Sequence, residues 1–189
     1  MSGTKGPQRS VLRVSVRQAH GFALIDLIFV CGVIGLLASI AMPSMFSARQ
    51  SAGAASAIGS MRTINSSQLT YALTCGAGFY APSLSRLGTA PAGSNAPFIG
   101  GGLGTADTVT KSGYIVQMSA TPFAGAPASC NGAAAGEDGQ GYKAAADPTL
   151  PTNPRFFATN PNTLIYEDVS TLFGSMPETG EPVTGHLIR

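Results

Sequence analysis

The chain has 189 residues, which is room for one modest domain with extensions but excludes two full hydrophobic cores. Charged residues make up only 11%, and the 24 glycines and 13 prolines approach a fifth of the chain, so we expect much of it to be loop. The net charge of +2 is unevenly divided. Residues 1–21 hold four basic side chains and no acid, whereas the remainder holds 7 basic and 9 acidic ones, a balance of −2.

The basic segment 1–21 comes directly before a long apolar run. Basic residues on one side of such a run favour the cytoplasm, so this pattern sets the orientation of the chain. A nucleic-acid-binding arm is the other interpretation, but the four charges at Lys5, Arg9, Arg13 and Arg17 are sparse for one. The pattern therefore predicts a cytoplasmic N-terminus and no nucleic-acid partner.

The apolar run extends from residue 22 to residue 42. As a helix rising 1.5 Å per residue it would span about 31 Å, close to the thickness of the hydrocarbon layer of a membrane. A secretory signal peptide has a shorter apolar region followed by a small-residue cleavage site, whereas Pro43 and a Ser-Met-Phe sequence follow this one. The simplest interpretation is a single-span anchor.

Two details do not fit a plain anchor. Asp26 lies four residues inside the apolar run, where a carboxylate costs roughly 2.5 kcal/mol or more and therefore needs a partner. The sequence His20-Gly21-Phe22 places a glycine at the junction between the basic segment and the apolar helix.

Gly21, Phe22, Asp26 and Pro43 together resemble the N-terminal signature of type IV pilins and type II secretion pseudopilins. The resemblance implies that a membrane peptidase cleaves between Gly21 and Phe22 and that Phe22 is then N-methylated. It also implies that Asp26 pairs with the N-terminal amine of a neighbouring subunit and that the helix kinks or melts at Pro43 in the filament. The chain departs from the family in having Asp instead of Glu at residue 26 and in its long leader of 21 residues.

Elementary chemistry supports these roles separately. An amine beside a carboxylate would neutralise both charges in a medium of low dielectric, which meets the cost of burying Asp26. Pro43 lacks a backbone donor and clashes with the carbonyl four residues earlier, so it weakens the helix there. The small residues Gly32, Gly35 and Ala38 allow neighbouring helices to approach closely.

Beyond the apolar run, residues 54–72 repeat apolar side chains at spacings of three and four, which predicts one buried face of a continuing helix. Gln68 interrupts this face, and we expect the helix to end near Cys75 with Gly76 as its cap. The apolar face consists of Ala54, Ala57, Ile58, Met61, Ile64, Tyr71 and Ala72.

Weaker motifs at 60–65, 80–82 and 111–114 also resemble sequences found in pilin subunits.

The rest of the chain predicts a helical turn over 83–88 with Ser83 as its cap, a surface loop over 88–106, and four strands. The strands are expected at 112–119, 141–145, 155–158 and 163–167. The fold class is therefore α+β: a long helix over 22–75, membrane-spanning at about 22–43, packs its outer half on a small antiparallel sheet. Residues 76–169 form the head with long loops, and residues 170–189 form an irregular tail.

Three cysteines are present. Cys31 lies in the apolar run, whereas Cys75 and Cys130 lie in the part expected outside the cytoplasm, where disulfides persist. One pairing is possible for these two, and it would stabilise the fold by about 4 kcal/mol in the chain-entropy model. Two free buried thiols are the alternative.

The sequence contains few residues that could form a catalytic site. His20 belongs to the leader, His186 is four residues from the end, and no Cys-x-x-Cys occurs. Each of the acidic pairs at 137–138 and 167–168 would supply only a weak set of ligands for calcium, so we expect them to be solvated loop charges. The five tyrosines are expected in or near the core rather than as a stacking platform for nucleic acid. We therefore expect no catalysis, metal or cofactor.

The sequence thus predicts a structural subunit of a type IV pilus or pilus-like filament, held in the bacterial inner membrane before assembly and then periplasmic or extracellular. Its expected partners are the prepilin peptidase and methyltransferase, copies of itself and other pilins, the inner-membrane assembly machinery, and membrane lipid. A type II secretion pseudopilin is one alternative. A periplasmic binding domain on a signal anchor is an alternative of another class.

Overall fold

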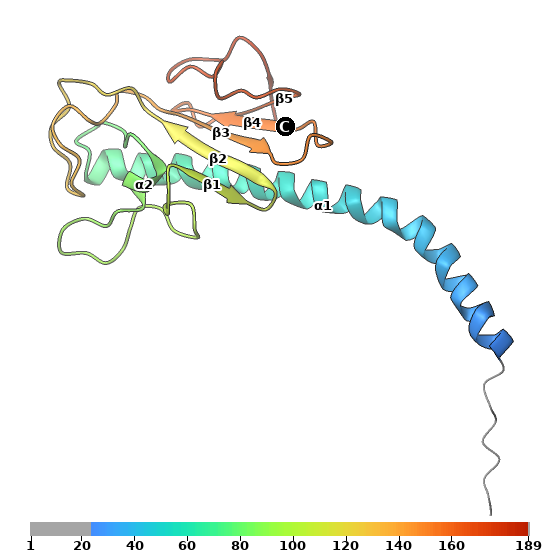
Figure 1. The fold of residues 1–189 in the computed structure, drawn as a ribbon. Helices are drawn as coiled ribbons and strands as arrows, with labels where there is room; N and C mark the ends of the chain where they lie inside the picture. Colours follow the sequence, from blue (N-terminus) through green and yellow to red (C-terminus); the bar gives the residue numbers. More distant parts are fainter. Residues whose placement is uncertain (1–23, 189) are drawn as a thin grey trace, which may run out of the picture. The chain divides into compact units, whose positions relative to one another are not determined.

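A computed structural model of the protein describes residues 24–188, which divide into two units after Ser44. The helix α1, Leu24–Thr74, has 51 residues and runs through both (Figure 1). The second unit adds the short helix α2, Leu84–Leu87, and a six-stranded sheet. The predicted α+β class is confirmed, because an N-terminal helix that begins as an apolar run contacts an antiparallel sheet.

The sheet is a meander in which every strand pairs antiparallel with its neighbours in sequence. Ser112 and Gly113 join the first two strands in a tight turn, and both have positive φ, 51° and 81°, as the type I′ form of a two-residue hairpin turn requires. The strands are β1 Thr108–Lys111, β2 Tyr114–Ser119, β3 Lys143–Pro148, β4 Phe156–Thr159, β5 Ile165–Asp168 and β6 His186–Leu187.

The central strands are buried on both faces. Successive side chains of a strand point to opposite faces, so Phe157 packs in the cluster beneath α1 and Ala158 in a second cluster on the other face. Leu172 and Met176, from the segment after β5, complete that second cluster. The sheet therefore lies between the outer part of α1 and a segment of the C-terminal region.

The outer part of α1 presents the predicted apolar face to the sheet. Most of the seven residues of that face are buried, and Ile58 is half-buried against the same cluster. A Cβ atom at Gly53 would lie 2.9 Å from the carbonyl oxygen of Ser112, so a glycine is needed where the β1–β2 turn crosses the helix. The predicted face is thus confirmed.

Three expectations about the head need correction. β1 and the short β6 were not predicted, and β6 with buried Leu172 and Met176 shows that the region after residue 170 is not simply an irregular tail. Ile99 and Leu103 are buried in the main core, so the glycine-rich stretch over 88–106 is not only a surface loop. Apolar residues set among glycines lack the periodicity that marks a core element.

Gln68, which interrupts the apolar face, is completely buried and acts as a polar link. Its side-chain amide donates to the carbonyl oxygen of Ala81 at 2.9 Å, and its carbonyl oxygen accepts from the Ala81 N–H at 2.9 Å. One turn earlier, Asn65 accepts a hydrogen bond from the Tyr142 hydroxyl at 2.7 Å and donates to the Thr163 carbonyl at 3.2 Å. These hydrogen bonds fix both the rotation of α1 and its position along the sheet.

Gln68→Ala should lower the free energy of unfolding by about 2–5 kcal/mol, because it leaves the buried N–H and C=O of Ala81 without partners. Denaturant unfolding of the full chain in detergent measures the change. Ser66→Ala, two residues away, is the control: the Ser66 hydroxyl is exposed and donates only to the Thr63 carbonyl, so its effect should stay within about 0.5 kcal/mol. Equal effects of the two substitutions would contradict this role for Gln68.

Candidate assembly segment and disulfide-bonded head

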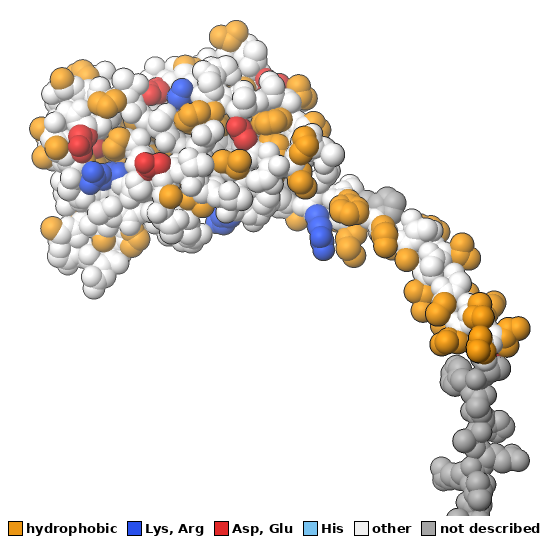
Figure 2. Space-filling model, in the orientation of Figure 1, with side chains coloured by type: hydrophobic (Ala, Val, Ile, Leu, Met, Phe, Trp, Pro, Cys, Tyr) orange, Lys and Arg blue, Asp and Glu red, His pale blue; other side chains and the backbone are white. Residues whose placement is uncertain are grey.

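The first unit is a helix whose apolar side chains face outward. Leu27 to Val30 are four consecutive exposed residues, and steps of about 100° distribute them around the whole helix circumference. Figure 2 shows the apolar side chains gathered on the visible face of this segment. The exposed large hydrophobic residues, with between 40% and 78% of their surface accessible, are Leu24, Ile25, Leu27, Ile28, Phe29, Val30, Val33, Ile34, Leu36, Leu37, Ile40 and Met42.

A helix that is apolar all round needs an apolar surrounding, and its own chain does not provide one among the described residues. By length and composition α1 can cross a membrane. The N-terminal apolar helix and the disulfide of the head together favour a membrane-anchored chain with an extracytoplasmic domain.

Asp26 is the acid of this segment. It lies in the first described turn of α1 with its side chain exposed. Across residues 24–188, no basic side chain forms an ion pair with it. A carboxylate in an apolar surrounding is costly unless its charge is compensated, so a cation that stabilises it within lipid or an assembly would have to come from outside the described residues of this chain.

The structure describes only part of the rest of the N-terminal signature. Gly21 and Phe22 lie outside the described residues. The helical backbone of α1 continues through Pro43. On either side of it, the hydroxyl groups of Ser39 and Ser44 donate to carbonyl oxygens of the same helix at 2.8 Å. Melting at Pro43 within a filament stays a prediction. Cys31 is a free, exposed thiol on this segment.

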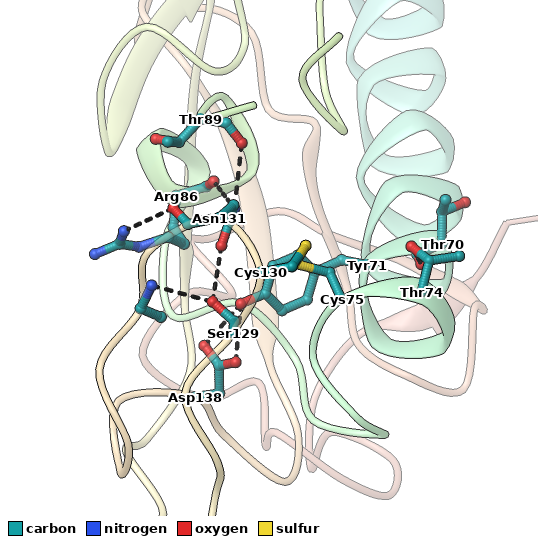
Figure 3. Close-up of a disulfide and its surroundings, with 11 residues drawn as sticks. Thr70, Tyr71, Thr74, Cys75, Arg86, Thr89, Ser129, Cys130, Asn131 and Asp138 are labelled. Carbon is teal, nitrogen blue, oxygen red and sulfur yellow. Dashed lines mark hydrogen bonds between the residues drawn. A yellow bond between two sulfur atoms is a disulfide. The ribbon is translucent and has the colours of Figure 1, made fainter. Parts of the chain in front are cut away.

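The end of α1 is tied to a loop of the head by a disulfide. Cys75 follows the last residue of the helix and is bonded to Cys130, with their Cα atoms 5.0 Å apart (Figure 3). Cys130 lies in the Cys130 loop, which we define as residues 120–142 between β2 and β3. The disulfide therefore ties that loop to the helix on which the sheet packs.

A buried carboxylate holds the same loop. The Tyr71 hydroxyl donates to Asp138 at 2.8 and 3.0 Å, and both residues are completely buried. Burial raises the pKa of Asp138, although the hydrogen bond from Tyr71 and the charge of Arg86 act in the other direction. Burial raises the pKa of the Tyr71 hydroxyl as well. Tyr71 is one helical turn before Cys75, so the two links hold neighbouring parts of the loop.

The tip of the Cys130 loop also docks on α2. The side-chain amide of Asn131 donates to the carbonyl oxygens of Arg86 at 2.7 Å and Thr89 at 3.2 Å, and Arg86 donates back to the Asn131 carbonyl at 3.3 Å (Figure 3). Arg86 also lies 3.5 Å from Glu137. Side-chain hydrogen bonds replace regular secondary structure in holding this long loop in place.

One acid of each acidic pair departs from the expectation of solvated loop charges, whereas Glu137 is exposed as expected. Asp138 is buried, and Glu167 accepts hydrogen bonds from Arg155 at 2.5 and 2.9 Å. The hydrogen bond from Arg155 lowers the pKa of Glu167. Within the described range, no group of three or more His, Cys, Asp or Glu side chains is placed to hold a metal ion. Asp138 thus contacts a residue 67 positions earlier in the chain, whereas Glu167 pairs with a residue 12 positions earlier.

Asn65, Gln68 and Asn131 were not singled out by the sequence as structural links. Each is a short or medium polar side chain whose partners become neighbours only in the folded head. The one available signal was Gln68, a polar residue on an otherwise apolar helix face. When the chain is compared with models of protein families, with curated proteins and with solved structures, no match is found in any of the three.

Proposed function

We propose that the chain is a structural, non-catalytic subunit of a type IV pilus or a related pilus-like filament. Polymerisation would proceed through the first part of α1 after the leader 1–21 has been removed. Before assembly the subunit would be held in the inner membrane, with the disulfide-bonded head outside the cytoplasm.

One observation carries this proposal: a helix that is apolar around its whole circumference has a single carboxylate, Asp26, near its start. A plain membrane anchor has no use for that acid, because its burial in lipid is costly. A new N-terminal amine at Phe22 would lie four residues from Asp26 in the sequence. In a packed bundle, the amine of one copy can neutralise the acid of the next copy.

The head supports the same function in a different way. Its sheet is covered on both faces, and the Cys130 loop is held by a disulfide as well as by hydrogen bonds. A rigid head of this kind suits a subunit that must keep its surface unchanged outside the cell, where disulfides are stable.

Mass spectrometry of the mature protein tests the proposal. The processed chain should begin at Phe22 and be heavier than the unmodified chain 22–189 by one methyl group. Gly21→Ala should leave the leader attached and prevent filament formation. An intact leader in the wild-type protein, or cleavage beyond residue 42, would instead indicate an anchor or a signal peptide.

A further inference from the structure

The second unit begins with an exposed apolar group built from two distant parts of the chain. Met45, Phe46 and Leu150 expose 58%, 67% and 60% of their surfaces. Phe46 and Leu150 line one cleft of about 320 Å³, together with Arg49 and Tyr114. A helix and a surface turn 104 residues apart in sequence, at Phe46 and Leu150, thus share an apolar surface.

The turn that carries Leu150 is held firmly. The N–H of Thr149 donates to the Gly113 carbonyl at 2.9 Å, and Asn153, which is 7% exposed, donates from its side chain to the Tyr114 hydroxyl at 2.9 Å. The Asn153 N–H also donates to the carbonyl oxygen of Leu150 at 3.1 Å. Leu150 is therefore kept at the surface by an ordered turn, although its side chain is apolar.

Arg49 gives this surface a positive charge. It is the first charged residue after Asp26, its side chain is exposed, and it lines the same cleft. No acidic side chain between residues 24 and 188 forms an ion pair with it. A guanidinium beside exposed apolar groups matches a phospholipid surface, where phosphate groups lie next to the ester-linked ends of the acyl chains.

Chain connectivity places this surface near the membrane if the first unit spans it. Phe46 follows Ser44, the last residue of the first unit, by two residues, so the length of the chain alone keeps it within about 7 Å of the end of that unit. We propose that Met45, Phe46, Arg49 and Leu150 form a lipid-binding foot that seats the head on an anionic phospholipid surface before assembly. This inference rests on the proposed function only in assuming that the apolar segment spans the membrane.

Tryptophan fluorescence tests the foot directly, because the chain contains no tryptophan. The processed full-length chain would carry Leu150→Trp and be placed, one copy per nanodisc, in bilayers containing phosphatidylglycerol. We expect blue-shifted emission that is quenched when the acyl chains are brominated near the headgroup. Thr152→Trp, an exposed position lining the same cleft, repeats the measurement in case Leu150→Trp perturbs the turn.

Val183→Trp is the matched control, because Val183 is 96% exposed and does not line this cleft. Its emission should stay red-shifted and unquenched. Arg49→Gln should reduce the quenching of Leu150→Trp in anionic bilayers to the level found in neutral ones. The inference is overturned if Leu150→Trp and Thr152→Trp are no more quenched than Val183→Trp, or if their blue shift occurs without quenching, which would mean that protein covers the surface.

The outcomes also separate this inference from the proposed function. Absence of quenching in a protein that forms filaments rejects the foot and leaves the function standing. Quenching in a protein that never forms filaments rejects the function and leaves the lipid contact standing.

Discussion

Replacement of Asp26 by asparagine is expected to abolish filament assembly while the head still folds. In the proposed filament the Asp26 carboxylate neutralises the amine of an adjacent Phe22 in an apolar surrounding. Removing one partner of such a buried pair leaves the other charge uncompensated, which costs about 3–5 kcal/mol. Each subunit contact would then weaken by roughly a hundredfold or more.

The measurement is the amount of protein recovered as sheared filaments, with electron microscopy of the same cells. Asp26→Glu is the conservative control: it keeps the charge and adds one methylene, and it should form filaments. Glu181→Gln is the charge-matched control, because it removes one negative charge from an exposed position in the head. Its filaments should be normal.

Membrane insertion and leader removal must be followed in the same variants. The asparagine variant should still be inserted, because loss of a charge makes the apolar segment easier to place in lipid. If Asp26→Asn is processed, inserted and assembled at the wild-type level, the carboxylate has no role between copies. The plain-anchor interpretation of the segment would then be the better one.

The elements that could be predicted from the sequence are those whose signal is local. The described part of the apolar run, residues 24–42, and the three-and-four spacing over 54–72 both appear as parts of α1. The four predicted strands correspond to β2, β3, β4 and β5, with ends shifted by up to three residues. In each case the hydrophobic pattern itself specifies the element.

The elements and strand ends that could not be predicted depend on partners far away in the chain. The strand predicted at 141–145 ends three residues before β3 does, and Ala144, Ala145 and Ala146 show no alternation, because α1 covers one face of β3 and the segment around Leu172 covers the other. A strand buried on both faces has no polar side to mark it. β6, only two residues long, is defined by its pairing with β5 and has no signal of its own.

For the candidate site, the sequence identified Asp26 because a carboxylate in an apolar helix is energetically costly. It identified the cysteine pair because only two cysteines lie in the part expected outside the cytoplasm. It did not identify the partners that hold the Cys130 loop. Asp138 appeared as one of two adjacent loop acids, yet it is buried against Tyr71, 67 residues earlier in the chain. A carboxylate and a hydroxyl so far apart leave no pattern that a local reading can detect.

Loss of the disulfide is expected to lower the free energy of unfolding of the head. Cys75 and Cys130 are separated by 55 residues, and closing a loop of that length restricts the unfolded chain by about 4 kcal/mol in the chain-entropy model. For a protein of this size, that corresponds to a decrease in Tm of roughly 8–16 °C. The double variant Cys75→Ser, Cys130→Ser measures it without a reductant.

Tyrosine fluorescence can follow unfolding of the full processed chain in detergent, because the protein has 5 tyrosines and no tryptophan. Tyr71, Tyr114 and Tyr142 are buried in the head, so their emission reports on its core. Cys31→Ser is the control. It removes a thiol of the same chemistry from the exposed part of α1 and should leave the unfolding of the head unchanged.

Comparison of unfolding with amide exchange in the double variant distinguishes two roles for the disulfide, restriction of the unfolded chain and stabilisation of the folded Cys130 loop. If the disulfide acts only through the unfolded chain, the double variant should unfold at lower denaturant while amide exchange in the folded Cys130 loop stays slow. Tyr71–Asp138 and Asn131 would then hold the loop without it. If the bond also holds the folded loop, exchange over residues 120–142 should rise at denaturant concentrations where the sheet stays protected. Unfolding identical to that of Cys31→Ser would mean that the bond contributes to neither state.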